Sequence, residues 1–472
     1  MTALLSLDRP LVAVNSDIDV AVSVARQRGE PVLFTRTELL PLRPDSLAFL
    51  AASSDALGGG ILWHQSQTGI SLSGAGSAID ISCDGPSRFG ETSAAVRKMA
   101  ASILRGDGDQ ETPFPIIGGF AFSGAKNGST VWRGFPGSRM VIPRVLLQCD
   151  RETALIRVTL PVEPHDTPFH IAHDMDDLFG AARRWAQAAM TVPAEPVYLT
   201  RQSLPARRTW ESSVATAVGL IRQEMLDKVV LAREERLRAN SPISPVSILE
   251  QLRSFDRDAT IYAMQSGQDW FLGASPERLV RLNKGRVDVT CLAGSIDIGQ
   301  NAEDQARLAE RLLASEKDRE EHEIVVRSTM DALAEVCDEV TRLSGTPRVV
   351  TARAVQHLET PVSGTLSSAG HVLDLVERLH PTPAVGGHPQ DVALRVIKEL
   401  ENFDRGWYAG PFGWTDLDGS GEFAVAIRSA LLSGNTASLF AGCGIVEDSV
   451  PAAEYDETCL KLRPMLAALG AL

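Results

Sequence analysis

The sequence predicts a layered α+β fold in which large mixed sheets form the core and helices pack outside them. Three observations support this prediction. Short apolar runs bounded by turn residues recur over residues 1–200, longer strand-like runs follow over residues 201–472, and amphipathic helices lie between them. The chain has 472 residues and can bury a large core, and its 44% apolar and 22% charged residues are typical of globular proteins.

Residues 1–200 form the less regular part of the predicted fold. Turn-bounded apolar runs predict strands, and longer periodic runs predict helices. The Pro-containing stretch 191–196 is a candidate linker, or a connection within one fold. The predicted strands are 31–34, 60–63, 116–122 and 154–160, and the predicted helices are 93–104 and 170–190.

Residues 201–472 carry longer and clearer signals, which we interpret as the catalytic part of one integrated domain. Val214, Val218, Ile221 and Met225 have helical spacing and predict a helix over 209–226. Further helices are predicted at 303–340, at 389–401 and from Pro451 onwards. The predicted strands are 261–264, 270–273, 287–292, 406–414, 423–432 and 437–446.

The composition excludes several classes of function. A net charge of −14 argues against nucleic acid or an anionic membrane as partner, so an anionic substrate would need local cations or a metal. The six cysteines are scattered without a CxxC motif, which disfavours zinc and disulfide frameworks and fits the reducing cytoplasm. No apolar stretch is long enough to span a membrane, and we expect no signal peptide.

The C-terminal helix carries a group of charged residues behind a glycine turn. Glu454 and Glu457 are three residues apart, and Lys461 follows one turn later on the same side. Two carboxylates and an ammonium beside glycine-freed amides suit a divalent metal that holds an anionic substrate. The alternative is a solvated helix end with an ordinary ion pair.

A second acidic pair, Asp318 and Glu321, has the same spacing on another predicted helix. The alternative is an exposed helix with surface ion pairs. If the two helices face each other across a cleft, four carboxylates converge. Mg²⁺ prefers oxygen ligands and keeps several waters, so one Glu from each helix and two acids bound to waters would satisfy it.

Lys228 and Glu277 are candidates for a base and an acid. Lys228 enters a strand-like apolar run, where it either reaches solvent or lies buried beside a substrate as a base. Glu277 follows a strand and a Ser-Pro turn, where it forms either a surface pair with Arg278 or a protonated acid. An acid and a base on different strands could add water at one carbon and expel hydroxide at another.

Arg428 is a candidate for binding a carboxylate. Over 422–428 the residues alternate, so that Ala424, Ala426 and Arg428 share one face of a strand. Alanines leave room beside a guanidinium, which indicates a pocket wall rather than a lone surface arginine.

Taken in order, these residues resemble the chorismate-utilising enzymes, a family that includes isochorismate, salicylate, anthranilate and aminodeoxychorismate synthases. The resemblance covers 208–469 and is weaker before it. It is carried by Lys228-Val-Val-Leu-Ala-Arg233, Gly273-Ala-Ser-Pro-Glu277, Leu292-Ala-Gly-Ser295, Lys317-Asp-Arg-Glu-Glu-His322, Val355-Gln-His-Leu358, His380-Pro-Thr-Pro-Ala-Val-Gly-Gly387, Arg405-Gly-Trp-Tyr-Ala-Gly410, Ile427-Arg428 and the C-terminal group.

The resemblance implies chorismate as substrate and Mg²⁺ as cofactor. It implies that Glu321 and Glu457 bind the metal directly, and that Asp318, a Glu in some members, and Glu454 lie behind them. The remaining residues would bind substrate: Arg428 and Tyr408 the side-chain carboxylate, Lys461 and the Gly442–Gly444 amides the ring carboxylate, with Gly294, His357 and Ala384 lining the pocket.

The choice among family members rests on a few positions. Water-adding members resemble this chain at Lys228, and salicylate synthases tend to carry Thr where this chain has Ala384. Isochorismate synthase is therefore the predicted activity, with salicylate synthase or a non-catalytic chorismate-binding homologue as alternatives. The resemblance also implies a cytoplasmic monomer without a glutaminase subunit, serving either menaquinone or siderophore synthesis.

Overall fold

The computed structural model describes residues 11–106, 109, 112–124, 131–190, 197–352, 355–366 and 370–472. Within these ranges the chain forms two large sheets, one of thirteen strands and one of ten. Each described strand pairing is antiparallel, apart from the parallel pairing of β1 with β5. The predicted α+β class with large mixed sheets is confirmed.

The larger sheet contains strands from both parts of the chain, with β2 hydrogen-bonded to β12. A further short strand, β19 (Gly387–His388), pairs with β11 outside the main order. The main order is β10 (Tyr198–Leu204), β11 (Lys228–Ala239), β23 (Thr436–Ile445), β22 (Ser429–Ser433), β13 (Asp269–Ser275), β12 (Thr260–Ser266), β2 (Ile61–Gln65), β3 (Ser71–Ala75), β8 (Val145–Cys149), β9 (Ala154–Val162), β1 (Val32–Leu39) and β5 (Ile103–Arg105).

The smaller sheet also mixes the two parts, because β6 pairs with β20. A short strand, β17 (Arg348–Ala352), pairs with β18 outside the main order. The main order is β16 (Cys337–Arg342), β18 (Val355–Leu366), β15 (Arg286–Asp297), β14 (Arg278–Asn283), β21 (Gly421–Val425), β20 (Pro411–Thr415), β6 (Ile116–Phe120), β7 (Ser138–Ile142) and β4 (Ile79–Cys83).

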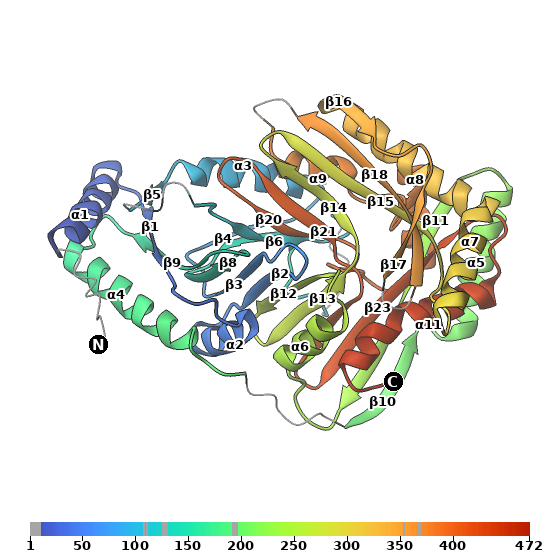
Figure 1. Ribbon diagram of the computed structural model, residues 1–472, viewed down its shortest axis with the longest axis horizontal. Coiled ribbons are helices and arrows are strands. Elements are labelled where there is room, and N and C mark those ends of the chain that lie inside the picture. Colours follow the sequence, from blue (N-terminus) through green and yellow to red (C-terminus); the bar gives the residue numbers. More distant parts are fainter. Residues whose placement is uncertain are drawn as a thin grey trace.

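Helices cover the outside of the sheets and both ends of the molecule (Figure 1). α1 and α4 lie at one end, and α5, α7, α8 and α11 lie at the other, where α8 packs on β15 and α11 on β23. The helices are α1 (Leu11–Arg28), α2 (Ser46–Leu57), α3 (Arg88–Ala100), α4 (Pro168–Trp185), α5 (Arg207–Arg222), α6 (Pro245–Phe255), α7 (Ala302–Ala314), α8 (Glu316–Ala334), α9 (Val372–Leu379), α10 (Gln390–Leu400) and α11 (Pro451–Ala468).

The main core lies between the two sheets and is rich in aromatic side chains. Trp63 of the larger sheet stacks on Phe412 of the smaller one, with ring centroids 6.5 Å apart, and Tyr262 lies 5.0 Å from the same ring. All three side chains are buried. Since each aromatic side chain removes a large apolar area from water, this contact is a major source of stability.

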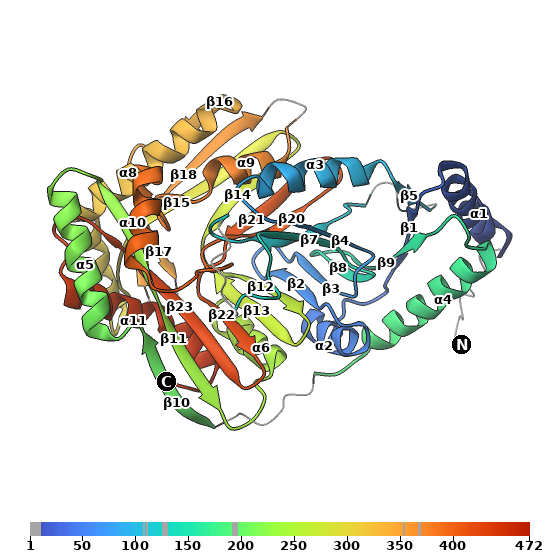
Figure 2. The same cartoon turned by 180° about the vertical axis from the view of Figure 1, so that it is seen from behind.

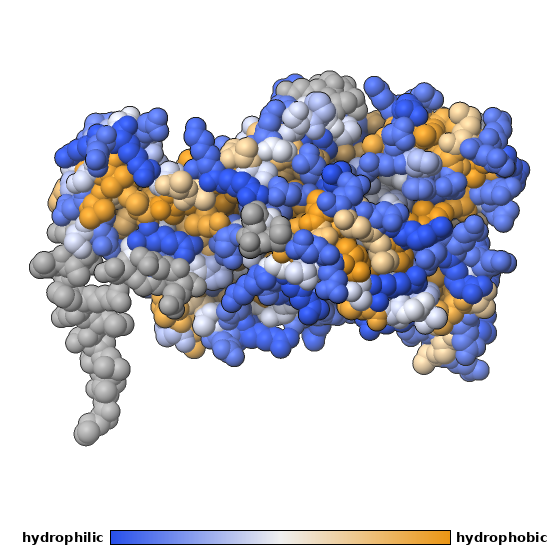
Figure 3. Space-filling model, turned by 90° about the horizontal axis from the view of Figure 1, so that it is seen from above, coloured by the Kyte–Doolittle hydropathy of each residue, from blue (hydrophilic) through white to orange (hydrophobic). Residues whose placement is uncertain are grey.

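The surface is largely polar, as Figure 3 shows for the face seen from above, where apolar residues form separate patches between charged ones. In the part of the chain that the structure describes, no helix is long and apolar enough to cross a membrane.

Four predicted helices differ from the structure. The helix predicted over 93–104 ends at Ala100, because Ile103 and Leu104 pair with β1 as strand β5. The helix 303–340 is two helices and the strand β16. The helices predicted over 170–190 and 209–226 end at Trp185 and Arg222, and residues 191–196 lie outside the described ranges.

The division of 303–340 has a local cause. Ser315 has extended backbone angles, and its Oγ accepts a hydrogen bond of 3.2 Å from the backbone N–H of Asp318. This is an N-cap, so a new helix begins at Glu316. Residues 337–342 then join the smaller sheet beside β18, because pairing in the fold overrides a helical pattern in the sequence.

The strand predicted over 423–432 is two strands in different sheets. β21 ends at Val425 in the smaller sheet, and β22 begins at Ser429 in the larger one. The chain crosses between the sheets at residues 426–428, where Arg428 has a φ of 54°. Similarly, the strand predicted over 406–414 begins only at Pro411, after a turn.

Candidate active site

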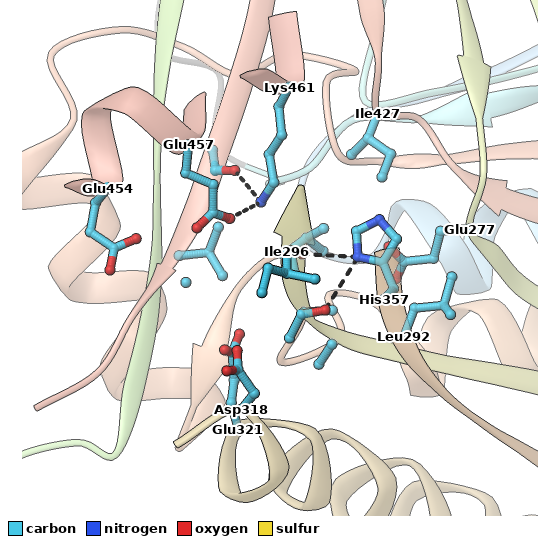
Figure 4. Close-up of a pocket in the computed structure, with 18 of the residues that line it drawn as sticks. Glu277, Leu292, Ile296, Asp318, Glu321, His357, Ile427, Glu454, Glu457 and Lys461 are labelled. Carbon is cyan, nitrogen blue, oxygen red and sulfur yellow. Dashed lines mark hydrogen bonds and ion pairs between the residues drawn. The ribbon is translucent and has the colours of Figure 1, made fainter. Parts of the chain in front are cut away.

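All fourteen residues that the sequence indicates as site residues line one cavity of about 500 Å³. The cavity lies at the ends of strands β11 and β23, where they face strand β15 and helices α8 and α11 (Figure 4). The fourteen residues are Lys228, Glu277, Gly294, Asp318, Glu321, His357, Ala384, Tyr408, Arg428, Gly442, Gly444, Glu454, Glu457 and Lys461.

Lys228 is buried in the cavity wall rather than extended to solvent. It is the first residue of β11 and is only 1% exposed. Its Nζ donates a hydrogen bond of 2.7 Å to Oε1 of Glu321 on α8. The strand therefore places an ammonium against the acidic helix, a contact that the sequence alone did not indicate.

Glu277 lies in the wall of the same cavity, after β13 and Pro276. Its backbone oxygen accepts a hydrogen bond of 3.0 Å from the N–H of Val425, which fixes the turn against the smaller sheet. Burial raises the pKa of Glu277 to about 7, although Lys228, Arg428 and Lys461 act in the opposite direction. A carboxyl group with this pKa is partly protonated at neutral pH and can give a proton to a leaving group.

The two acidic pairs face the cavity from α8 and α11, as Figure 4 shows. Burial raises the pKa of Asp318, and the charges of Glu321 and Glu457 raise it further. Burial also raises the pKa of Glu454, which is 5% exposed, with the charge of Glu457 as the next contribution. This mutual repulsion favours the uptake of a cation between the helices.

Three lysines contact these carboxylates and alter the expected arrangement. Lys228 binds Glu321, Lys461 Nζ lies 2.7 Å from Oε1 of Glu457, and Lys317 Nζ lies 3.6 Å from Oε1 of Glu454.

The four carboxylates line one cavity, but three of them, Glu321, Glu454 and Glu457, are paired with lysines. Among the described residues, no three His, Cys, Asp or Glu side chains are arranged to hold a metal by themselves.

The donor set nevertheless fits Mg²⁺, because it offers carboxylate oxygens without sulfur. One carboxylate from each helix, completed by water, would require no cluster of three. Gly444 leaves the space beside this set open, since a Cβ at that position would lie 2.8 Å from both Glu321 Oε1 and Lys228 Cε.

Cationic groups line the part of the cavity that would hold carboxylates. Lys461 Nζ also donates to the backbone oxygen of Gly442 at 3.0 Å. Burial lowers the pKa of Lys461, but Glu457 outweighs this effect and leaves the pKa raised. Burial lowers the pKa of the Arg428 guanidinium and raises the pKa of Tyr408 to about 12.

Arg428 reaches this cavity by a different route from the predicted one. It does not lie on a continuous strand with Ala424, because β21 has already ended at Val425. Its positive φ belongs to the crossing between the sheets, and this turn carries the guanidinium into the cavity wall. The predicted position in the pocket is confirmed, and the predicted alternating strand is wrong.

His357 is a neutral hydrogen-bonding group in the wall. Its Nδ1 lies 2.9 Å from Ser295 Oγ and 3.3 Å from the backbone oxygen of Gly294 (Figure 4). Burial lowers its pKa to about 3, and the positive charges of Arg428 and Lys461 act in the same direction.

The sequence did not indicate several residues that line the cavity, among them Lys317, Arg311 and Ser315. For Ser315 a signal existed, because Ser-x-x-Asp before an apolar run is a capping pattern. Lys317 carried no such signal, since its contact with Glu454 depends on how α8 and α11 face each other.

Comparison with known proteins identifies the class of molecule. Residues 20–470 match the sequence profile of the family described as chorismate binding enzyme. The chain is 37% identical, over 100% of its length, to the salicylate biosynthesis isochorismate synthase of Pseudomonas aeruginosa, of which it covers 97%. The protein belongs to the chorismate binding enzyme family.

Two isochorismate synthases of this family are also similar to the chain, one in sequence and one in fold. The chain is 39% identical to the isochorismate synthase MenF of Bacillus subtilis over 75% of its own length and 74% of that protein. Its fold resembles that of MenF, the menaquinone-specific isochorismate synthase from Escherichia coli, with a TM-score of 0.77 and 25% identity, over 96% of this chain and 100% of that one.

Proposed function

We propose that this protein is an isochorismate synthase, an isomerase that converts chorismate to isochorismate by adding water at C2 and releasing the C4 hydroxyl. The observation that carries the proposal is the position of Lys228 and Glu277 in one cavity, the first buried and the second with a pKa of about 7. Isochorismate synthases among the relatives support it.

The reaction needs a base and an acid at two carbons of one ring. Lys228, in its amine form, takes a proton from the water that attacks C2, and protonated Glu277 gives a proton to the C4 hydroxyl as it leaves as water. One water enters and one departs, so the atoms balance and the reaction is reversible with the two roles exchanged. Other groups in the same wall must hold the substrate still while this happens.

Chorismate is a dianion, and the cationic groups of the cavity match its two carboxylates. Arg428, with Tyr408 beside it in the wall, is positioned for one carboxylate, and Lys461 with the Gly442–Gly444 amides for the other. We propose Mg²⁺ as cofactor, held by Glu321 and Glu457, with Asp318 and Glu454 behind them. When bound, Mg²⁺ would orient the ring carboxylate and stabilise negative charge on it.

We further propose that the protein works in the cytoplasm as a monomer without a glutaminase partner, since water rather than ammonia is the nucleophile. Its pathway is either menaquinone or siderophore synthesis, and among the similar proteins one is named menaquinone-specific and another vibriobactin-specific.

Product analysis tests the proposal. Purified protein is incubated with chorismate and Mg²⁺, with a parallel sample in EDTA, and the products are separated by chromatography. We expect isochorismate with Mg²⁺ and none with EDTA. Salicylate and pyruvate as main products would indicate salicylate synthase instead, and no consumption of chorismate would indicate a binding protein.

A further inference from the structure

A second cavity, of about 1090 Å³, lies apart from the residues of the first. It is bordered by α3, α9 and α10, which face the viewer in Figure 2, and by β11 and β23. None of the fourteen site residues lines it. Five aromatic side chains from different parts of the chain line it, namely Phe89, Phe122, Trp132, Phe403 and Phe440.

Arg88 lines this cavity as a buried cation. Its side chain is 5% exposed, and its guanidinium lies 4.4 Å from the ring centroid of Phe89. One terminal nitrogen donates to the backbone oxygens of Ala121 at 3.0 Å and Phe122 at 3.4 Å. Its Nε is buried without a hydrogen-bond partner.

The other arginines that line the cavity have acidic partners. Arg236 pairs with Glu234, Arg395 with Asp391 and Arg405 with Glu401. Within the described ranges, Arg88 alone among these four arginines has no carboxylate within 4.0 Å. Burying a charge without a counter-ion costs free energy, so binding of an anion beside this guanidinium would be favourable.

The start of α3 adds a second feature that favours an anion. Arg88 is the first residue of this thirteen-residue helix, and the N-cap Ser87 makes no side-chain hydrogen bond. The N–H of Arg88 donates to the backbone oxygen of Gly85 at 3.4 Å, while the next N–H groups of the first turn and the positive end of the helix dipole lie beside the guanidinium. Pro86 and Phe89 also line the cavity, which places this helix end in its wall.

Besides Glu234 and Glu401, which pair with arginines, two further carboxyl groups line the cavity, and neither forms an ion pair with Arg88. Glu377 is exposed, and its charge acts on Arg88 only over a distance. Burial raises the pKa of Asp404, whose carboxyl group accepts a hydrogen bond of 2.9 Å from the N–H of Gly406. Lys398 lines the same cavity and is exposed on α10.

We propose that this second cavity binds a small planar aromatic carboxylate. Its carboxylate group would contact Arg88 and the first turn of α3, and its ring would lie against the aromatic walls. The stacked walls favour a flat ring over an aliphatic acid. A neutral amide of the same shape would leave the charge of Arg88 uncompensated.

The two cavities share a wall but not a ligand site. Phe440 lines the second cavity, and its ring stacks on Tyr408 of the first with centroids 5.3 Å apart and planes at 25°. An anion at Arg88 therefore does not occupy the substrate groups around Arg428, and the two sites can be separated by substitution.

Calorimetric titration with benzoate tests the proposal, with benzamide and acetate as controls. We expect saturable benzoate binding that weakens at least about tenfold in Arg88→Met, and both controls at least about tenfold weaker. Arg428→Lys should leave this binding unchanged, and Arg88→Met should turn over chorismate as the unchanged protein does. Fluorescence of Trp132, which lines the cavity, gives a second readout.

Two results would overturn the proposal. One is the absence of saturable benzoate binding up to about 20 mM. The other is binding that survives Arg88→Met but is lost in Arg428→Lys, which would place benzoate in the substrate site. If Arg88→Met does not fold, Phe403→Ala replaces it, with the same expected loss of benzoate affinity, because Phe403 is only half-buried in the wall.

Discussion

Glu277 should make the protein less stable as the pH rises through the acidic range. Its pKa is about 7 in the fold against an ordinary value of 4.5. Below pH 4.5 this carboxyl group is protonated in both the folded and the unfolded state, so it adds no pH dependence to the free energy of unfolding. Between pH 4.5 and 7 the unfolded chain releases this proton while the folded protein keeps it, so stability falls by about 3 kcal/mol in all.

The comparison with Glu277→Gln isolates this contribution, because the amide resembles the protonated acid and does not titrate. Free energies of unfolding in urea are measured for both proteins at several values between pH 5 and 8. The unchanged protein should lose about 2–3 kcal/mol relative to the variant over this range, most of it below pH 7. Parallel curves for the two proteins would refute the argument that burial holds Glu277 protonated.

Three further substitutions probe other parts of the site. Lys228→Met removes the ammonium from Glu321 and should tighten Mg²⁺ binding about tenfold or more by calorimetry, and unchanged or weaker binding would contradict this. Gly444→Ala should abolish most turnover, because the new Cβ at position 444 displaces the ends of Lys228 and Glu321. Its melting temperature should stay near that of the control Gly219→Ala, a helical position with nothing near its Cβ. Arg428→Lys should raise KM for chorismate about tenfold or more with a smaller effect on kcat, and an unchanged KM would remove this residue from substrate binding.

The composition of the site could be predicted from the sequence because its chemistry depends on local spacing. Glu454, Glu457 and Lys461 share one side of a helix by periodicity alone, and Asp318 and Glu321 do the same. The family resemblance implied that these residues lie together in one site, and the structure places them in one cavity.

The remaining features depend on pairings between distant segments, which local patterns do not encode. The crossing at Arg428 exists because β21 and β22 pair in different sheets, while the local alternation continues across it. In the same way, the contact of Lys228 with Glu321 joins residues ninety-three positions apart. Ser315 was the exception, since its capping pattern was present in the sequence.

Turnover of chorismate in ¹⁸O-labelled water tests the central claim most directly, because the claim is that Lys228 activates a water that becomes the C2 hydroxyl. Mass spectrometry of the isochorismate formed early in the reaction should find one ¹⁸O atom in that hydroxyl. Lys228→Ala and Glu277→Gln should form almost none of this product while remaining folded. Isochorismate without the label, or labelled product at the usual rate from either variant, would contradict the account.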